Sequence, residues 1–369
     1  MYSLRHDMCL LKKTSHSGEI VNPFMRQLLK LTFASMICAS VLPANAVTQS
    51  QSQFRALAEA ADETETSAIA GKDDWLFLVS ELRALGRDAF WGKDAANLNV
   101  DPFHALTDLN EKLKALNIDL ILCPAPPRAV IYADKILDDP PRDAQGVLQR
   151  SDGQLQALYD ALRKAGVSVL DVTEAMMAAR ADDEKLGPVS CEQDSHWSPR
   201  GSGIVAKAVA DEVRKRHDYA VPKKSPFTHK GPEPLSFVGD LATLVPGHGS
   251  TKRSASITRV TQDAAGTMPL IFDDESPVLL LADSHGLVFS AGDDMHSSGA
   301  GFAEQLSVEL GFAVDLMARR GSGDQIRTDI ARRFIMKPDE AAKKRVLVYL
   351  FAARTFSESK NWKIVPLKR

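Results

Sequence analysis

Apolar positions along the chain follow two spacings. Five segments place apolar residues three and four positions apart, the period of a helix with one buried face: Pro102–Asn117, Gly153–Ala165, Arg200–Arg216, Gly301–Leu310 and Asp324–Met336. Five shorter runs are apolar at nearly every position, as in strands buried on both faces: Ile118–Cys123, Val167–Leu170, Val278–Leu281, Ala313–Met317 and Arg345–Phe351. Their alternation predicts an α/β fold with a parallel sheet covered by helices on both sides, in three layers.

The remaining segments have the composition of connections. Residues 47–69 are polar and alanine-rich, which predicts a flexible or helical lead-in to one domain over residues 70–369. Gly71–Leu78 is typical of a turn that enters a short buried strand. Pro124 and the prolines after it are expected to end the preceding strand, and the proline, lysine and glycine content of Val221–Pro234 predicts an irregular excursion.

The N-terminus has the composition of an export signal. A short basic region follows Met25, a mostly apolar stretch runs from Leu31 to Leu42, and an Ala-x-Ala pattern ends at Ala46. We therefore predict a signal over residues 1–46 that is cleaved after Ala46, with translation starting at either Met1 or Met25. The alternative is an uncleaved anchor in the inner membrane. Either reading places the remaining chain in the periplasm.

Charge and cysteine content narrow the function further. Without residues 1–46 the chain carries 40 basic and 46 acidic groups, which gives no support for nucleic-acid binding. Cys123 and Cys191 would remain in an oxidising compartment, so a disulfide between them and a pair of inert thiols are both open. No cofactor is expected from the sequence.

Two short motifs carry the candidate chemistry. Asp194 and His196 are two residues apart, so in extended backbone both side chains face the same way. Ser284 follows the apolar run Val278–Leu281 and precedes Gly286 by two positions, as in a tight turn that exposes a nucleophile. We predict that Ser284 is the nucleophile, His196 its base and Asp194 the group that orients the imidazole.

Other side chains are expected near this pocket, because ligands of parallel sheets bind at the carboxyl ends of the strands. Arg128, Arg320 and Arg354 follow strand ends and are candidates for binding a carboxylate or stabilising an oxyanion. The backbone N–H groups of Ser284 and Gly286 are candidates for the same oxyanion.

Three further positions are interpreted with alternatives. Trp197 is predicted to pack against the His196 loop, with sugar stacking as the alternative. His285 either lines the pocket or faces outward. The isolated histidines, among them His296, are interpreted as surface or loop residues.

A metal site is the rival interpretation of the same motifs. Asp-x-His pairs occur at residues 194–196 and 283–285, and carboxylates and imidazoles are ligands of zinc and other divalent metals. His248 is isolated in sequence, and no further histidine cluster accompanies the two pairs. The sequence therefore favours nucleophilic catalysis over a metal centre.

Several motifs together resemble the alginate O-acetyltransferases of the AlgJ/AlgX type, which contain a domain similar to SGNH hydrolases. The similar segments begin near residue 70 and extend over most of the remaining chain. The most specific is Asp194–Trp197, which resembles an Asp-x-His-Trp signature. The others are Gly71–Phe77, Cys123–Arg128, Gly239–Leu241 and Ala282–Ser284, where Asp74, Arg128 and Ala282 stand in place of the commoner glycine, lysine and glycine.

This resemblance implies an SGNH-hydrolase-like domain in which the acid and base precede the serine, the reverse of the order in ordinary SGNH esterases. It implies a periplasmic enzyme that moves acetyl groups onto hydroxyls of an exported polysaccharide through an acetyl-serine. The implied partners are the polysaccharide, a membrane acyltransferase that supplies acetyl groups, and other export proteins. An acetylesterase with the same triad and a non-catalytic polysaccharide-binding component are the alternatives. The polymer itself stays open between alginate, cellulose and others.

Overall fold

In the computed structural model of the protein, residues 44–216, 222, 225–321 and 323–367 are described, and they belong to one compact unit. The predicted export signal lies almost entirely outside them. Helix α2 (Ala44–Glu63) occupies much of the predicted lead-in, and its Phe54 is buried against α3 (Val79–Gly86). Among the described residues, no helix combines the length and apolar character needed to cross a membrane.

The core is a five-stranded parallel sheet with the order β4-β3-β9-β7-β8. The strands are β3 (Asp119–Ala125), β4 (Ser168–Val169), β7 (Val278–Ala282), β8 (Asp315–Ala318) and β9 (Val346–Ala352). Every residue of β7 and β9 is buried, as the continuous apolar runs predict. Because the strands are parallel, the loops after β3, β7 and β9 leave the sheet at the same edge.

The expectation that Pro124 ends its strand is wrong, because β3 continues to Ala125. Leu122 accepts a hydrogen bond from Leu170 on the β4 side, whereas Ala125 accepts one from Ala353 on the β9 side. By alternation, the missing N–H of Pro124 faces the β4 side, and β4 has already ended there. The proline therefore removes no hydrogen bond from the ladder.

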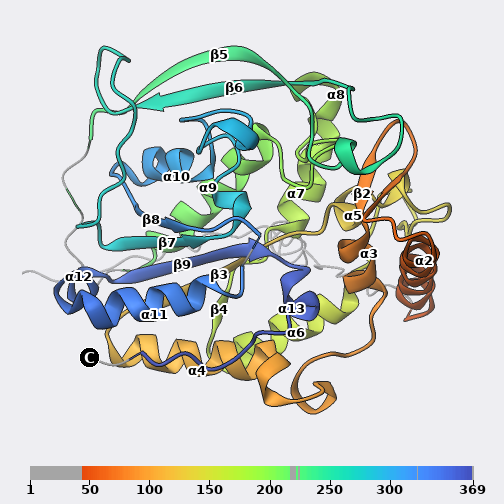
Figure 1. The fold of residues 1–369 in the computed structure, drawn as a ribbon, viewed down its shortest axis with the longest axis horizontal. Coiled ribbons are helices and arrows are strands. Elements are labelled where there is room, and N and C mark those ends of the chain that lie inside the picture. Colours follow the sequence, from red (N-terminus) through yellow and green to blue (C-terminus); the bar gives the residue numbers. More distant parts are fainter. Residues whose placement is uncertain (1–43, 217–221, 223–224, 322, 368–369) are drawn as a thin grey trace, which may run out of the picture. The chain divides into compact units, whose positions relative to one another are not determined.

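Helices cover both faces of the sheet (Figure 1), so the fold is the predicted three-layer α/β arrangement. On one face lie α9 (Pro199–Val213) and α10 (Phe302–Leu310), and on the other α4 (Pro102–Ala115), α6 (Gly153–Lys164) and α11 (Ile326–Met336). Asp101 and Ser198 cap α4 and α9 by accepting from the N–H groups of Phe103 and Gly201. The shorter helices are α5 (Arg128–Ile131), α7 (Thr173–Ala179), α8 (Asp183–Leu186), α12 (Pro338–Lys343) and α13 (Thr355–Glu358).

Two antiparallel strand pairs lie outside the main sheet. One joins β1 (Ala68–Ala70) to β2 (Leu76–Leu78), and the other joins β5 (Thr228–Phe237) to β6 (Arg253–Thr261). The second pair corrects the prediction of an irregular segment for Thr228–Pro234, whereas Val221, Lys223 and Lys224 of that prediction lie outside the described residues. A two-stranded pair has a free edge on each strand, so prolines cost it few hydrogen bonds. Figure 1 shows this pair packed outside α9 and α10.

Candidate active site

Ser284 lies in a turn that the end of β7 and the neighbouring β9 hold in place. It is the first residue of a short 3₁₀ helix, η6 (Ser284–Gly286), which Asp283 caps by accepting from the N–H of His285 at 2.8 Å. The other oxygen of Asp283 accepts from the N–H of Ala352 at 2.7 Å. A Cβ on Gly286 would lie 2.4 Å from the Cβ of Ala282, so the turn has room only for glycine.

The segment that carries Asp194 and His196 is fixed from two sides. The buried guanidinium of Arg128 donates to the carbonyls of Cys191, at 2.6 Å, and Asp194. On the other side Gly239 packs so closely that a Cβ there would lie 2.0 Å from the carbonyl oxygen of Gln193. These contacts place the Asp194 and His196 side chains before any substrate binds.

The structure brings Ser284, His196 and Asp194 together although 88 residues separate the serine from the histidine. The serine Oγ lies 2.8 Å from His196 Nε2, and His196 Nδ1 lies 2.6 Å from Asp194 Oδ1. The three residues are 9 %, 6 % and 1 % exposed, respectively. This is the geometry in which an imidazole takes a proton from a hydroxyl while a carboxylate orients the ring.

Electrostatics favour the charge states that this relay needs. Burial alone opposes ionisation of Asp194, but attraction to His196 and hydrogen bonds from His196 and His296 hold the pKa of Asp194 well below its ordinary value. Burial also opposes protonation of His196, yet the Asp194 charge outweighs burial and raises the pKa of His196. Asp194 is therefore a stable carboxylate that strengthens His196 as a base.

Two residues around Asp194 were not among the predicted site residues. His296 Nε2 lies 2.7 Å from Asp194 Oδ2, and the N–H of Asp240 donates to the same oxygen at 2.8 Å. Asp240 also accepts from the N–H and hydroxyl of Ser195, at 2.6 and 2.5 Å. The sequence drew attention to Asp240 only because the Gly239–Leu241 motif resembles one in the family. His296 lies in a loop, as the sequence predicts, but its side chain is only 9 % exposed and contacts the carboxylate of Asp194.

These contacts weigh against the metal interpretation. Donor atoms of Asp194, His196 and Asp240 lie within 4.8 Å of one another, a spacing that a cation could use. However, Asp194 Oδ1 already accepts from the N–H and Nδ1 of His196, and Oδ2 accepts from Asp240 and His296. A carboxylate has about four lone-pair sites, so none is left for a metal.

The serine opens onto a cavity of about 400 Å³ at the carboxyl edge of the sheet. Arg354 and Lys360 line this cavity, and the structure records no hydrogen bond or ion pair for either side chain within the described residues. Arg320 does not line it. Its guanidinium is half exposed and pairs with Asp294 at 2.6 Å. Of the three predicted arginines, only Arg354 thus faces the serine as a free cation.

For two of the other groups predicted to bind an oxyanion the prediction is wrong, because each already has a hydrogen-bond acceptor within the protein. The N–H of Gly286 donates to the carbonyl of Asp283 at 3.1 Å, so it is already used within the turn. Arg128 is occupied by two backbone carbonyls and is 3 % exposed. The N–H of Ser284 stands at the first position of η6, where no helical partner exists. Of the two backbone N–H groups predicted to bind the oxyanion, that of Ser284 therefore stays available to a ligand.

Comparison with known families reveals a relationship over most of the chain. A family model described as "SGNH hydrolase-like domain, acetyltransferase AlgX" matches residues 68–349. The chain belongs to this family.

Curated members of the AlgX and AlgJ type are distant relatives in sequence. The chain is 24% identical to the probable alginate O-acetylase AlgJ of Pseudomonas aeruginosa over 262 residues, which are 67% of this chain and 61% of that protein. It is 23% identical to the alginate biosynthesis protein AlgX of Pseudomonas fluorescens over 302 residues, or 79% and 56%. The chain therefore spans about three fifths of the length of these relatives.

Solved structures show the same fold. The O-acetyltransferase domain of Pseudomonas putida AlgJ superposes with a TM-score of 0.60 at 19% identity, covering 80% of this chain and 93% of that one. Pseudomonas aeruginosa AlgX gives 0.55 at 18% identity, with 79% and 67% covered. The predicted SGNH-hydrolase-like fold and the predicted family are thus confirmed.

In this AlgX-family chain, His285 and Trp197 form a packed layer behind the relay. His285 is 4 % exposed, with Nδ1 3.1 Å from Asp283, and its ring meets those of His196 and Trp197 edge to face, each at 5.0 Å. Burial lowers the pKa of His285, and the attraction of Asp283 offsets this only partly. Trp197 also packs against Phe302. Both residues support the His196 ring, as the packing interpretation of Trp197 predicts.

The disulfide that the sequence left open is absent, because Cys123 and Cys191 are both free, buried thiols. Cys123 is part of β3, in the middle of the sheet, whereas Cys191 lies in the loop before Asp194 with Sγ 3.5 Å from the carbonyl of Trp197. Burial raises the pKa of Cys123 to about 12. Burial also raises the pKa of Cys191, so both thiols are inert.

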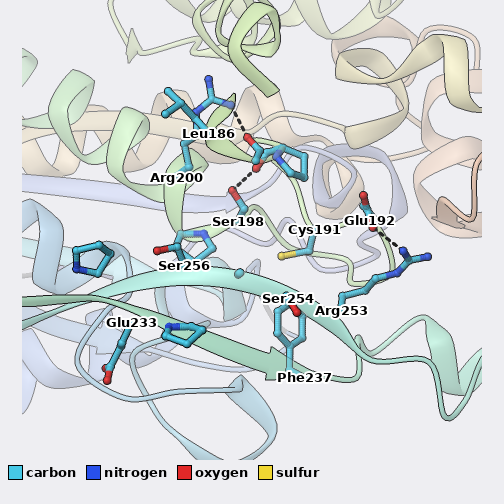
Figure 2. Close-up of a pocket in the computed structure, with 16 residues that line it drawn as sticks. Leu186, Cys191, Glu192, Ser198, Arg200, Glu233, Phe237, Arg253, Ser254 and Ser256 are labelled. Carbon is cyan, nitrogen blue, oxygen red and sulfur yellow. Dashed lines mark hydrogen bonds and ion pairs between the residues drawn. The ribbon is translucent and has the colours of Figure 1, made fainter. Parts of the chain in front are cut away.

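A second cavity, of about 520 Å³, lies on the other side of the Asp194 loop. Figure 2 shows Cys191 and Ser198 on its loop wall and Phe237 on the wall formed by β5 and β6. Its arginines are paired, for example Arg253 with Glu192 at 3.0 Å. Ser284 is not among the residues lining it.

Proposed function

We propose that this protein is a periplasmic O-acetyltransferase that moves acetyl groups onto hydroxyls of an exported polysaccharide through an acetyl-Ser284 intermediate. The supporting observation is the continuous hydrogen-bonded line from Ser284 Oγ through His196 to Asp194. Membership of the acetyltransferase AlgX family supplies the chemical class. The names of the relatives point to alginate as one acceptor.

The geometry supports a two-step transfer. In the first step Ser284 Oγ attacks the acetyl carbonyl of the donor while His196 Nε2 takes the hydroxyl proton, and the imidazolium then protonates the leaving group. In the second step His196 takes a proton from a sugar hydroxyl, whose oxygen attacks the acetyl carbon. The imidazolium then returns the proton to Ser284 Oγ as the bond between Oγ and the acetyl carbon breaks. The Ser284 N–H stabilises the oxyanion of each tetrahedral intermediate.

Two cations in the cavity favour an acidic acceptor, although Asp283, Asp324 and Glu358, which all have hydrogen-bond partners, also line it. Arg354 and Lys360 are cations without a recorded partner among the described residues, and both line the space in front of Ser284. A uronate carboxylate would pair with either group, and a guanidinium can bind it through two parallel hydrogen bonds. An acidic polysaccharide is therefore the acceptor class that these two cations support.

The proposed setting follows from the N-terminus and from the class of reaction. The export signal predicted over residues 1–46 would deliver the chain to the periplasm. Acetyl groups would reach that compartment through a membrane acyltransferase partner, and other export proteins would bring the polymer to the cavity.

Ser284→Ala tests the proposal, with Ser250→Ala as a matched control on an exposed loop. The purified protein is incubated with an acetyl ester donor, with and without an acidic oligosaccharide, and examined by mass spectrometry. The wild type and Ser250→Ala should acetylate both the peptide that contains Ser284 and the sugar, whereas Ser284→Ala should do neither.

Three results would contradict the proposal in different ways. Transfer that survives in Ser284→Ala excludes the acetyl-serine. Release of acetate at a rate that the sugar leaves unchanged, with no acetylated sugar, identifies an acetylesterase. Unchanged polymer acetylation in cells carrying Ser284→Ala identifies a non-catalytic component.

A further inference from the structure

A second imidazole contacts the carboxylate of the relay. His296 Nε2 lies 2.7 Å from Asp194 Oδ2, the oxygen that His196 Nδ1 does not contact. The His296 side chain is 9 % exposed, and that of Asp194 is 1 % exposed. An ionised carboxylate can only accept, so Nε2 of His296 carries the hydrogen and donates it. Asp194 is thus held between two rings, one on each oxygen.

The chain holds the His296 ring in a costly backbone conformation. His296 has a φ of +69°, a left-handed value that is uncommon for residues with a Cβ. Hydrogen bonds between backbone groups of neighbouring residues close the loop around it, such as Gly292 N–H to the carbonyl of Ser297 at 2.9 Å. Strain of this kind persists where surrounding contacts determine the geometry, and it concentrates at functional sites.

Aromatic rings fix the direction of the imidazole. The ring of Phe237 lies 4.3 Å from that of His296, and the ring of Phe289 lies 5.8 Å away. Phe237 belongs to β5 and lines the second cavity (Figure 2), while Phe289 follows η6 in sequence. With both rings in place, the N–H of His296 has Asp194 as its acceptor.

We propose that His296 is a positioning residue for the relay, an assignment that rests on the proposed function. Its hydrogen bond fixes the rotamer of Asp194, and so the direction in which Oδ1 meets His196. It also draws negative charge from the carboxylate, which limits how strongly Asp194 stabilises the protonated form of His196. The ionisable groups around the carboxylate are His196, Asp240 and His296, with Arg128 bound to the Asp194 carbonyl. The His196 ring is also near His285 and the Asp283 carboxylate, which every variant retains.

His296→Phe and His296→Gln separate hydrogen bonding from packing. Phenylalanine keeps an aromatic ring between Phe237 and Phe289 but donates nothing, whereas the glutamine amide can reach Asp194 with an N–H. His229→Phe, at an exposed position of β5, is the matched control. We expect kcat for acetyl transfer to fall about 10- to 100-fold in His296→Phe, the range for one hydrogen bond to a charged group, with KM nearly unchanged. His296→Gln should recover most of the loss.

The pH profile gives a second readout. Without the His296 hydrogen bond, Asp194 keeps more charge and stabilises the imidazolium more strongly. The acidic limb of kcat/KM should therefore move to higher pH in His296→Phe and stay in place in His296→Gln. Thermal melting of each variant confirms that the folded protein is being compared.

Two outcomes would overturn the proposal. Wild-type kcat and pH profile in folded His296→Phe would show that the contact is idle. A loss of activity in His296→Gln that His296→Phe does not share, with an unmoved pH profile, would show that the ring only packs. The low-field proton resonance of His196 Nδ1–H needs no turnover, so it decides the question even if the wild type transfers no acetyl group. It should shift in His296→Phe and remain in His296→Gln.

Discussion

Replacing Arg128 with methionine tests whether this arginine supports the Asp194 loop or binds substrate. Its guanidinium donates to the carbonyls of Cys191 and Asp194 and lies 5.4 Å above the ring of Phe77. Methionine fills a similar volume but leaves both buried carbonyls without their donor. A residue that binds substrate would instead affect KM and leave stability unchanged.

The magnitude follows from two opposing free energies. Two hydrogen bonds from a charged donor contribute about 1.5–3 kcal/mol each, roughly 3–6 kcal/mol in total. Removing a cation that is 3 % exposed returns part of this, because burying an ion costs several kcal/mol. Burial likewise lowers the pKa of Arg128. We expect a net loss of about 1–3 kcal/mol, or roughly 2–6 °C in Tm for a domain of this size.

Calorimetry and acetyl-transfer kinetics on the same preparations provide the assay. Arg128→Met should lower Tm and reduce kcat at least tenfold, because a shift of about 1 Å in a reacting group can cost about 100-fold. Arg320→Met is the control, since its exposed ion pair should contribute at most about 1 kcal/mol. An unchanged Tm combined with a raised KM in Arg128→Met would refute the structural interpretation.

Two further predictions concern the turn and the base. Gly286→Ala should destabilise the protein by about 1–3 kcal/mol through overpacking and lower kcat by displacing Ser284, because the new Cβ would lie 2.4 Å from Ala282; wild-type Tm and kcat would contradict this. The acidic limb of kcat/KM should lie above the ordinary histidine value of about 6.5, because Asp194 raises the pKa of His196 and only the neutral ring is a base. A limb at or below 6.5 in a pH titration would contradict this. Because the pKa of His196 is raised in the folded protein, its contribution to the free energy of unfolding is complete at low pH. That contribution is lost as the pH rises through the raised pKa.

The sequence predicted the elements of the fold correctly where a single local pattern determines the structure. Continuous apolar runs identified β7 and β9, and the Ser198-Pro199 pair marked the start of α9. It misled where local preference and tertiary context disagree. Pro124 reads as the end of a strand, yet it is tolerated because β4 is too short to need its N–H. The prolines of β5 are tolerated at the free edges of a two-stranded pair.

The candidate site divides in the same way. Asp194, His196 and Ser284 are recognisable because their spacing and their strand-end position carry the chemistry. Arg128 and Gly286 were chosen for the same pocket, but backbone partners occupy their donors. His296 was missed because 102 residues separate it from Asp194 and no motif surrounds it.

The sequence by itself determined which segments form the sheet, which residue types can carry acyl transfer, and the order in which they occur. Those properties depend on side-chain chemistry and on spacings of a few residues. Only the tertiary structure decided which donors are free, which cysteines are apart, and which histidine supports the carboxylate. Each polar atom forms only a few hydrogen bonds. Long-range packing, which no local pattern records, decides which groups are its partners.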